Sequence, residues 1–313
     1  MSVSFWIWMA VLAVFVFFLL PTFIMAGVLY TVLLVRNKPD KWGRVCSFPE
    51  DEEYVGMYGE ALDWHEKWSG NMREVSVTND GLRLAGEYFD FGAKRAVIIV
   101  AGRTEACLYG CYFAEPYRAA GYNVLIIDNR AHGLSEGRYA TLGVKESRDL
   151  LAWSELLHGE LGNEGVWLHG VCIGAAAALY ALTAKDCPDW MLGMTADGMF
   201  TTFYESFKNH MIDMHHPNFP LTLEVMAHIR LWAGSNVVTD GPIKHVAALK
   251  KPILFLHSRE DVFSLPEKAE LLYGRCGSPN KKLVWFEKGA HSRLRVNDTE
   301  RYDLAVREFL KSV

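Results

Sequence analysis

This sequence lacks the features that mark several common classes of protein. Its 313 residues include 32 Lys and Arg against 37 Asp and Glu, so no basic excess indicates a nucleic-acid partner. No G-x-G-x-x-G motif follows an apolar run and no P-loop is present, so no nucleotide cofactor is indicated. Internal repeats and low-complexity tracts are also absent. The composition, half of it hydrophobic, favours one large globular core.

Cysteine is scarce: the chain has six, and none forms a C-x-x-C pair. A disulfide scaffold and a cysteine-ligated zinc site are therefore not expected, and we take all six as free thiols. Cys107 and Cys111 are four residues apart, a helical spacing more typical of packing than of redox chemistry. His210, His215 and His216 are close in sequence but lack the ligand pattern of a metal site, so we expect no bound metal.

Charge is absent from residues 3–35, which are dominated by Phe, Trp, Leu, Val, Ile and Met. This stretch exceeds the roughly 20 residues that a helix needs to cross a bilayer. A cleaved signal peptide is the alternative, but no Lys or Arg precedes the apolar run, which is also far longer than a signal-peptide core. We therefore expect a single-pass membrane anchor.

The basic residues near the anchor determine its expected orientation. All of them follow the apolar segment: Arg36, Lys38, Lys41 and Arg44. By the positive-inside rule the rest of the chain is then cytoplasmic, and free cysteines agree with a reducing compartment. One Asn-x-Thr sequon at Asn297 favours the other side.

The chain after the anchor divides into two parts. Residues 36–70 are polar and aromatic-rich, which predicts a linker leading into a juxtamembrane helix without a functional role. From residue 71 to 313, an expected hairpin is followed by short apolar runs that alternate with helical stretches. This alternation predicts an α/β domain with a mostly parallel sheet and helices on both faces.

Residues 198–250 interrupt the alternation with aromatic and Met-rich helical patterning. An insertion late in a parallel sheet lies over the carboxyl ends of the strands, where ligands bind, so this segment is a candidate cap. Additional helices packed on the core are an alternative interpretation compatible with the first.

The strongest chemical signal is the turn Gly170-Val171-Cys172-Ile173-Gly174, between an apolar run and an Ala-rich helix. Strand, sharp turn and helix form the nucleophile elbow, in which flanking glycines permit the turn and the central side chain is exposed. Cys172 occupies the central position where Ser is usual. A thiolate is a strong nucleophile, so the chemistry is retained in principle, although the pentapeptide alone fits an ordinary turn equally well.

An acid and a base follow in the order that this type of site requires. Asp261 follows the apolar run 252–257, and His291 follows the apolar run 283–286. Cys172, Asp261 and His291 are therefore expected at one edge of the sheet as a Cys-His-Asp triad. Asp197, after the run 193–196, is the alternative acid.

With these residues, the chain from about residue 73 resembles the α/β-hydrolase superfamily, specifically bacterial membrane-anchored hydrolases related to the Bem46 group. Residues 128–135 are similar to the family's D-x-R-x-H-G-x-S turn. The resemblance implies an oxyanion hole formed by the backbone N–H groups of Arg103 and Ile173. The chain departs from the family pattern at Cys172 for Ser, Ala101 for the His of His-Gly, and Ser258 for Gly.

The resemblance implies an enzyme that hydrolyses ester or thioester bonds through an acyl-cysteine, without a cofactor. Cysteine nucleophiles occur in this superfamily, in dienelactone hydrolases and polyhydroxyalkanoate synthases. The apolar cap and the anchor suggest a lipid-like acyl substrate. Two alternatives stay open: an acyltransferase that uses the same acyl-enzyme, and a catalytically silent, membrane-associated binding module.

Overall fold

The computed structural model describes residues 2–313, and its core is an eight-stranded sheet. The strand order is β1-β2-β4-β3-β5-β6-β7-β8. β1 pairs antiparallel with β2 and β2 with β4, whereas all later neighbours are parallel. The strands are β1 (Met72–Asn79), β2 (Leu82–Phe89), β3 (Arg95–Val100), β4 (Tyr122–Ile127), β5 (Gly165–Val171), β6 (Met191–Asp197), β7 (Ile253–Ser258) and β8 (Lys281–Phe286). The predicted hairpin and parallel sheet are confirmed.

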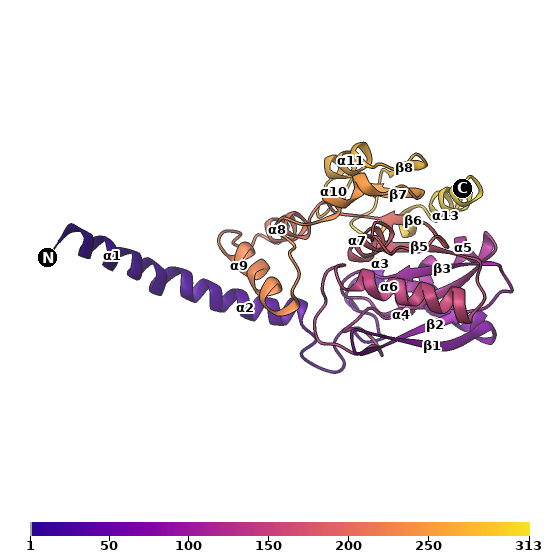
Figure 1. Cartoon of the computed structure of the whole chain (residues 1–313), viewed down its shortest axis with the longest axis horizontal. Coiled ribbons are helices and arrows are strands. Elements are labelled where there is room, and N and C mark those ends of the chain that lie inside the picture. The colour runs from indigo at the N-terminus through magenta and orange to yellow at the C-terminus, as the bar shows by residue number, and fades with distance from the viewer. Residues whose placement is uncertain (1) are drawn as a thin grey trace.

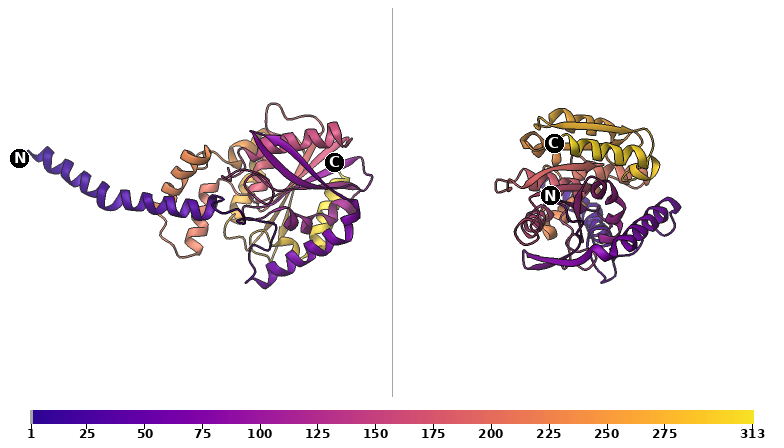
Figure 2. Two further views of the ribbon diagram at one scale, coloured as in Figure 1. Left: turned by 90° about the horizontal axis from the view of Figure 1, so that it is seen from below. Right: turned by 90° about the vertical axis from the view of Figure 1, so that its right-hand side faces the viewer.

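Helices cover both faces of this sheet (Figure 2). On one face lie α3 (Glu52–Trp68), α4 (Cys107–Gly110), α5 (Glu115–Ala119), α12 (Leu294–Asn297) and α13 (Thr299–Lys311). On the other lie α6 (Glu146–Glu155), α7 (Ile173–Leu182), α10 (Pro242–His245) and α11 (Pro266–Arg275). Successive side chains of a strand point to opposite faces, so Val97 and Ile99 of β3 pack on the first layer, and Ile98 and Val100 on the second. Strands buried on both faces explain the continuous apolar runs in the sequence.

The interval 198–250 contains two helices that pack outside the sheet layers. They are α8 (Phe203–Asp213) and α9 (Leu221–His228), and a π-helical turn at Ile229–Ala233 extends α9. We refer to residues 203–233 as the cap. Its buried apolar side chains form a cluster with Ala26, Tyr30 and Leu34 of the N-terminal helix and with Ile173 of α7.

The N-terminal apolar segment is one long helix, Val3–Leu34, in which an 18-residue window has a mean hydropathy of 2.6. It comprises α1 (Val3–Val14), a π-helical turn and α2 (Leu20–Leu34). No residue of α1 is buried, whereas Ala26, Tyr30 and Leu34 of α2 are. Figure 1 shows α1 projecting away from the domain and α2 lying beside α9.

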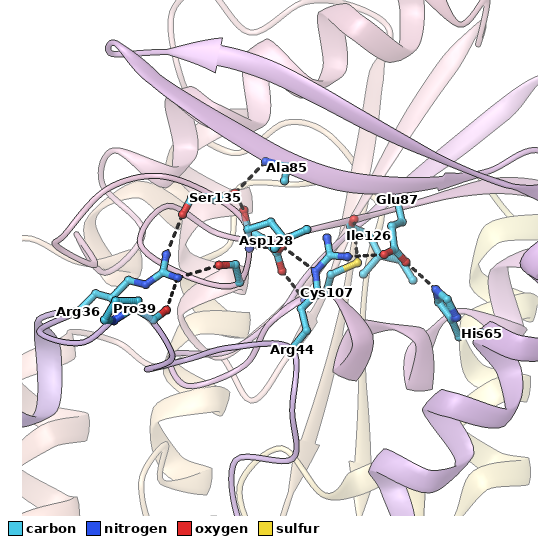
Figure 3. Close-up of polar contacts among 12 residues, drawn as sticks. Arg36, Pro39, Arg44, His65, Ala85, Glu87, Cys107, Ile126, Asp128 and Ser135 are labelled. Carbon is cyan, nitrogen blue, oxygen red and sulfur yellow. Dashed lines mark hydrogen bonds and ion pairs between the residues drawn. The ribbon is translucent and has the colours of Figure 1, made fainter.

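Two arginines fasten the linker after this helix to the domain (Figure 3). Arg36 donates hydrogen bonds to the carbonyl oxygens of Gly133 (2.9 Å) and Ser135 (2.9 Å). Arg44 pairs with the buried carboxylates of Asp128 (2.9 Å) and Glu87. The linker is therefore attached to the domain through hydrogen bonds of Arg36 to carbonyl oxygens and through ion pairs of Arg44 with buried carboxylates.

Replacing Arg44 by Met is expected to lower the free energy of unfolding by about 3 kcal/mol, because two buried carboxylates lose their cation. Denaturant titration of the full chain in detergent measures this change. The control is Arg148→Met, which removes a pair with Asp186 at the exposed surface and is expected to change stability little. Equal stability of the Arg44 variant and the wild type would contradict the structural role of this pair.

Candidate active site

Cys172 stands at the sharp turn between β5 and α7, where the elbow was predicted. Its backbone has φ 53° and ψ −109°, a conformation that non-glycine residues rarely adopt. The flanking glycines are sterically required: a Cβ on Gly170 would lie 2.4 Å from the nitrogen of Ala175, and one on Gly174 would lie 2.2 Å from the oxygen of Val100. The turn thus presents Cys172 at the start of α7, on the wall of a cavity.

Asp261 and His291 follow β7 and β8 and lie in direct contact. His291 Nδ1 is 2.7 Å from Asp261 Oδ2, and Asp261 Oδ1 accepts the backbone N–H groups of Phe263 (2.9 Å) and Ser264 (2.8 Å). A carboxylate can only accept, so this contact places the imidazole proton on Nδ1. The two loops therefore fix both the position and the tautomer of His291.

The electrostatics of this pair favour a charged imidazole. Burial by itself lowers the pKa of His291, but the carboxylate of Asp261 and then Cys172 raise it, and the net result lies well above the ordinary value. For Asp261, burial raises the pKa, but the interaction with His291 outweighs it, so the pKa lies below the usual range. An imidazolium formed at His291 is thus stabilised by a neighbouring negative charge.

The second ring nitrogen of His291 is available for chemistry. Nε2 is buried, and no hydrogen-bond partner for it occurs among residues 2–313. His291 lines the same cavity as Cys172, and interaction with Cys172 contributes to the pKa of the imidazole. The structure therefore brings the three predicted residues together, with His291 between Asp261 and the cavity that Cys172 borders.

Two backbone N–H groups without an acceptor among residues 2–313 belong to residues that line the same cavity. Arg103, in the loop after β3, and Ile173, the first residue of α7, both line the cavity. Within the described part of the chain, neither of their N–H groups donates a hydrogen bond to a backbone or side-chain acceptor. The N–H at the start of a helix is free for a ligand, so this pair can hold an oxyanion beside Cys172.

The loop that carries Arg103 is held from two sides. The ring of His132, from the predicted D-x-R-x-H-G-x-S turn, hydrogen-bonds through Nε2 to the carbonyl oxygen of Arg103. The guanidinium of Arg103 donates to the carbonyl oxygen of Leu33 (3.0 Å), in the last turn of α2. The end of the N-terminal helix is therefore in direct contact with a residue of the cavity wall.

The cavity has a volume of about 390 Å³, and aromatic rings form much of its wall. Phe203 and Phe207 come from α8, so the cap forms part of the site. Phe48 and Tyr54 also line the cavity, although they come from the segment 36–70, for which no functional role was expected. Its aromatic-rich composition was the available signal, but a sequence without a clear period does not show where its rings pack.

The alternative acid is placed differently. Asp197 ends β6 and accepts a hydrogen bond from the hydroxyl of Tyr302 (2.8 Å), not from His291. Burial raises its pKa to about 7, although the Tyr302 hydrogen bond opposes this. The geometry favours Asp261 as the partner of the imidazole.

Of the remaining candidates, Cys107, Cys111 and His210 lie in the core or on the cavity wall, whereas His215 and His216 are exposed. Cys107 and Cys111 are buried in the core, where Cys107 Sγ donates to the carbonyl oxygen of Ile126. His210 lines the cavity from α8. Within residues 2–313, no group of three or more His, Cys, Asp or Glu side chains is arranged to hold a metal ion.

These features define the class of protein. A mostly parallel sheet with a sharp turn after β5, and an Asp–His pair from the loops after β7 and β8, is the arrangement of an α/β hydrolase. The class stated from the sequence resemblance is therefore confirmed at the level of the fold.

Comparison with known proteins agrees with the assignment of an α/β-hydrolase fold. No protein-family model matches the chain. It is 29% identical over 219 residues to the uncharacterized protein YqkD of Bacillus subtilis, covering 69% of this chain and 71% of YqkD. Identity is 28% to the protein bem46 of Schizosaccharomyces pombe (58% of this chain, 56% of bem46) and 26% to the uncharacterized membrane protein YNL320W of Saccharomyces cerevisiae (62% of each). The chain thus spans less than two thirds of the latter two relatives.

Among solved structures, the Pyrococcus furiosus esterase Pf2001 superposes with a TM-score of 0.67 at 25% identity, over 79% of this chain and 93% of the esterase. The chain has the α/β-hydrolase fold and is similar in sequence to Bem46-like proteins. These similarities support a hydrolase as the general activity.

The charge of Asp261 is the largest contribution that raises the pKa of His291. In Asp261→Asn this contribution is lost while the effect of burial remains, so the pKa of His291 is expected to fall. NMR titration of the full chain with labelled histidine measures it. The matched control is Asp240→Asn, which removes a carboxylate that pairs with His245 outside the site and is expected to leave His291 unchanged. An unchanged His291 titration in Asp261→Asn would refute this account.

Proposed function

We propose that this protein is a membrane-anchored hydrolase that cleaves ester or thioester bonds through an acyl-cysteine on Cys172. One observation supports this most directly. The Asp261–His291 pair leaves Nε2 unpartnered within the described residues, in a cavity that also exposes a cysteine on a strained elbow. Nucleophile, base and orienting acid are the groups that acyl transfer requires.

In the first half of the proposed reaction, the thiol proton of Cys172 passes to His291 Nε2, which gives the thiolate–imidazolium pair that the raised pKa of His291 favours. The Cys172 sulfur then attacks the carbonyl carbon of the substrate. Negative charge develops on the carbonyl oxygen, where the N–H groups of Arg103 and Ile173 stabilise it. The alcohol or thiol then leaves with the proton from His291, and the acyl group remains on sulfur as a thioester.

Water completes the cycle. His291 removes a proton from a water molecule, which attacks the acyl-cysteine, and collapse of the second intermediate releases the acid and restores the thiol. Throughout, Asp261 keeps Nδ1 protonated and stabilises the imidazolium that forms in each half. An acyl acceptor other than water would turn the same intermediate into an acyltransferase reaction.

The anchor is the second element of the proposal. The helix Val3–Leu34 is long and apolar enough to span a bilayer, and the relative YNL320W is described as a membrane protein. Because the basic residues follow the helix, the positive-inside rule places the hydrolase domain in the cytoplasm. The substrate class follows from the site: a largely aromatic wall suits an apolar acyl chain beside Cys172.

The test is exposure of the full chain in detergent to an activated short-chain ester, read by intact mass, peptide mapping and ester consumption. We expect acylation of Cys172 and, in Cys172→Ala, a loss of turnover of about a thousandfold or more with the fold retained. Cys187→Ala removes another half-buried thiol outside the cavity and is expected to leave turnover intact.

The outcomes separate the alternatives. Normal turnover in Cys172→Ala would refute the acyl-cysteine mechanism. If the folded wild type neither forms an adduct nor consumes ester, a binding module becomes the better interpretation. Products analysed with added alcohol or amine acceptors distinguish hydrolysis from acyl transfer.

A further inference from the structure

The N-terminal helix begins to contact the cap only after a membrane-spanning length of chain. From Val3 to Thr22 it runs for roughly 20 residues, or about 30 Å, which matches the hydrocarbon core of a bilayer. Thr22 Oγ1 then donates to Glu224 Oε1 of α9 (2.9 Å). The cap therefore lies next to the helix where the helix leaves the bilayer core.

The contact between α2 and α9 is close and specific. His228 Nε2 lies 3.0 Å from the carbonyl oxygen of Phe23, and its ring stacks on Phe23 and Tyr30. At Gly27 a Cβ would come within 3.0 Å of the His228 ring, so the two helices approach closely. The cap thus packs at a defined position on the N-terminal helix, between Thr22 and Tyr30.

Both α2 and the cap expose apolar side chains. On α2 the exposed residues include Ile24, Met25 and Val28. On the cap a set that we name the cap face is exposed at the end of α8, the start of α9 and the π-helical turn: Ile212, Met214, Phe219, Leu223, Leu231 and Trp232. Phe219 is 79% exposed. Apolar surface gathered beside a membrane-spanning helix indicates contact with lipid.

The cap face and the cavity share one helix. α8 carries Phe203 and Phe207 on the cavity wall and leads to Ile212 and Met214 at its other end. Its 11 residues span about 16 Å. In Figure 1, α8 and α9 lie beside the N-terminal helix, on the side of the domain from which α1 projects.

We propose that the cap face inserts into the interface of the bilayer that the anchor spans, and that the cavity receives its acyl ester from the lipid phase. This inference rests on the proposed function and specifies its substrate as an ester held in the membrane. The bilayer is favoured over a protein partner because the cap face continues the exposed apolar surface of the anchor. The exposed Arg230 beside Leu231 adds a cation suited to lipid phosphates.

The insertion is tested with the full chain in phosphatidylcholine nanodiscs that contain a lipid with a diazirine in its acyl chain. After irradiation, adducts are expected on peptides covering residues 3–22, which report the anchor, and on peptides covering 212–223. Adducts on the anchor peptides alone would overturn the proposal. Cross-links between the cap faces of two copies, in place of lipid adducts, would assign the face to self-association and would also overturn it.

The effect on substrate access is measured with the double variant Met214→Ser/Phe219→Ser. Hydrolysis of a long-chain ester embedded in vesicles is expected to fall about tenfold, while hydrolysis of a soluble short-chain ester is unchanged, because neither residue lines the cavity. Leu304→Ser is the control, an exposed apolar residue on α13, away from the anchor (Figure 1). Wild-type turnover of the embedded ester by the double variant would refute the inference, whereas failure of wild-type protein on both esters would refute the proposed function.

Discussion

The buried carboxylate of Asp128, at the end of β4, connects more parts of this structure than any other single group described above. Oδ1 accepts the backbone N–H of Cys107 (2.7 Å), and Oδ2 accepts the N–H of Leu134 (2.9 Å) and Nε of Arg44 (2.9 Å). The carboxylate is fully buried, so these donors replace the water that it would otherwise hold. One side chain thereby joins the sheet, the segment after Arg103 and the linker from the anchor.

Asp128 begins the turn 128–135, which also contains His132. The ring of His132 hydrogen-bonds to the carbonyl oxygen of Arg103 and so connects this turn to the candidate site. Arg103 in turn contacts Leu33, and Lys41 donates to the carbonyl oxygen of Val32 (2.7 Å). Two cations thus cap the last turn of the N-terminal helix, where the helix dipole favours positive charge. The N-terminal helix is therefore in direct contact with the loop that carries Arg103, one of the two backbone donors of the candidate site.

Much of the fold was predictable because its signals are local. Continuous apolar runs indicate strands that are buried on both faces. Two glycines around Cys172 indicate the elbow, and the uncharged stretch indicates the N-terminal helix. The order of Cys172, Asp261 and His291 then constrained the site, because loops after parallel strands emerge at one edge of the sheet. The contributions of Phe48 and Tyr54 were not predictable, because an aperiodic linker does not specify the surface on which it packs.

By itself, the sequence determined the class of sheet, the identity of the nucleophile candidate and the existence of an apolar N-terminal helix, since each depends on residues close together in the chain. Only the tertiary structure decided which acid meets the imidazole: Asp261, in the loop after β7, contacts His291, whereas Asp197, at the end of β6, accepts a hydrogen bond from Tyr302. It also decided that the cap packs on α2 through Glu224 and His228. Such contacts join residues some two hundred positions apart, and their geometry exists only once the sheet has brought both segments together.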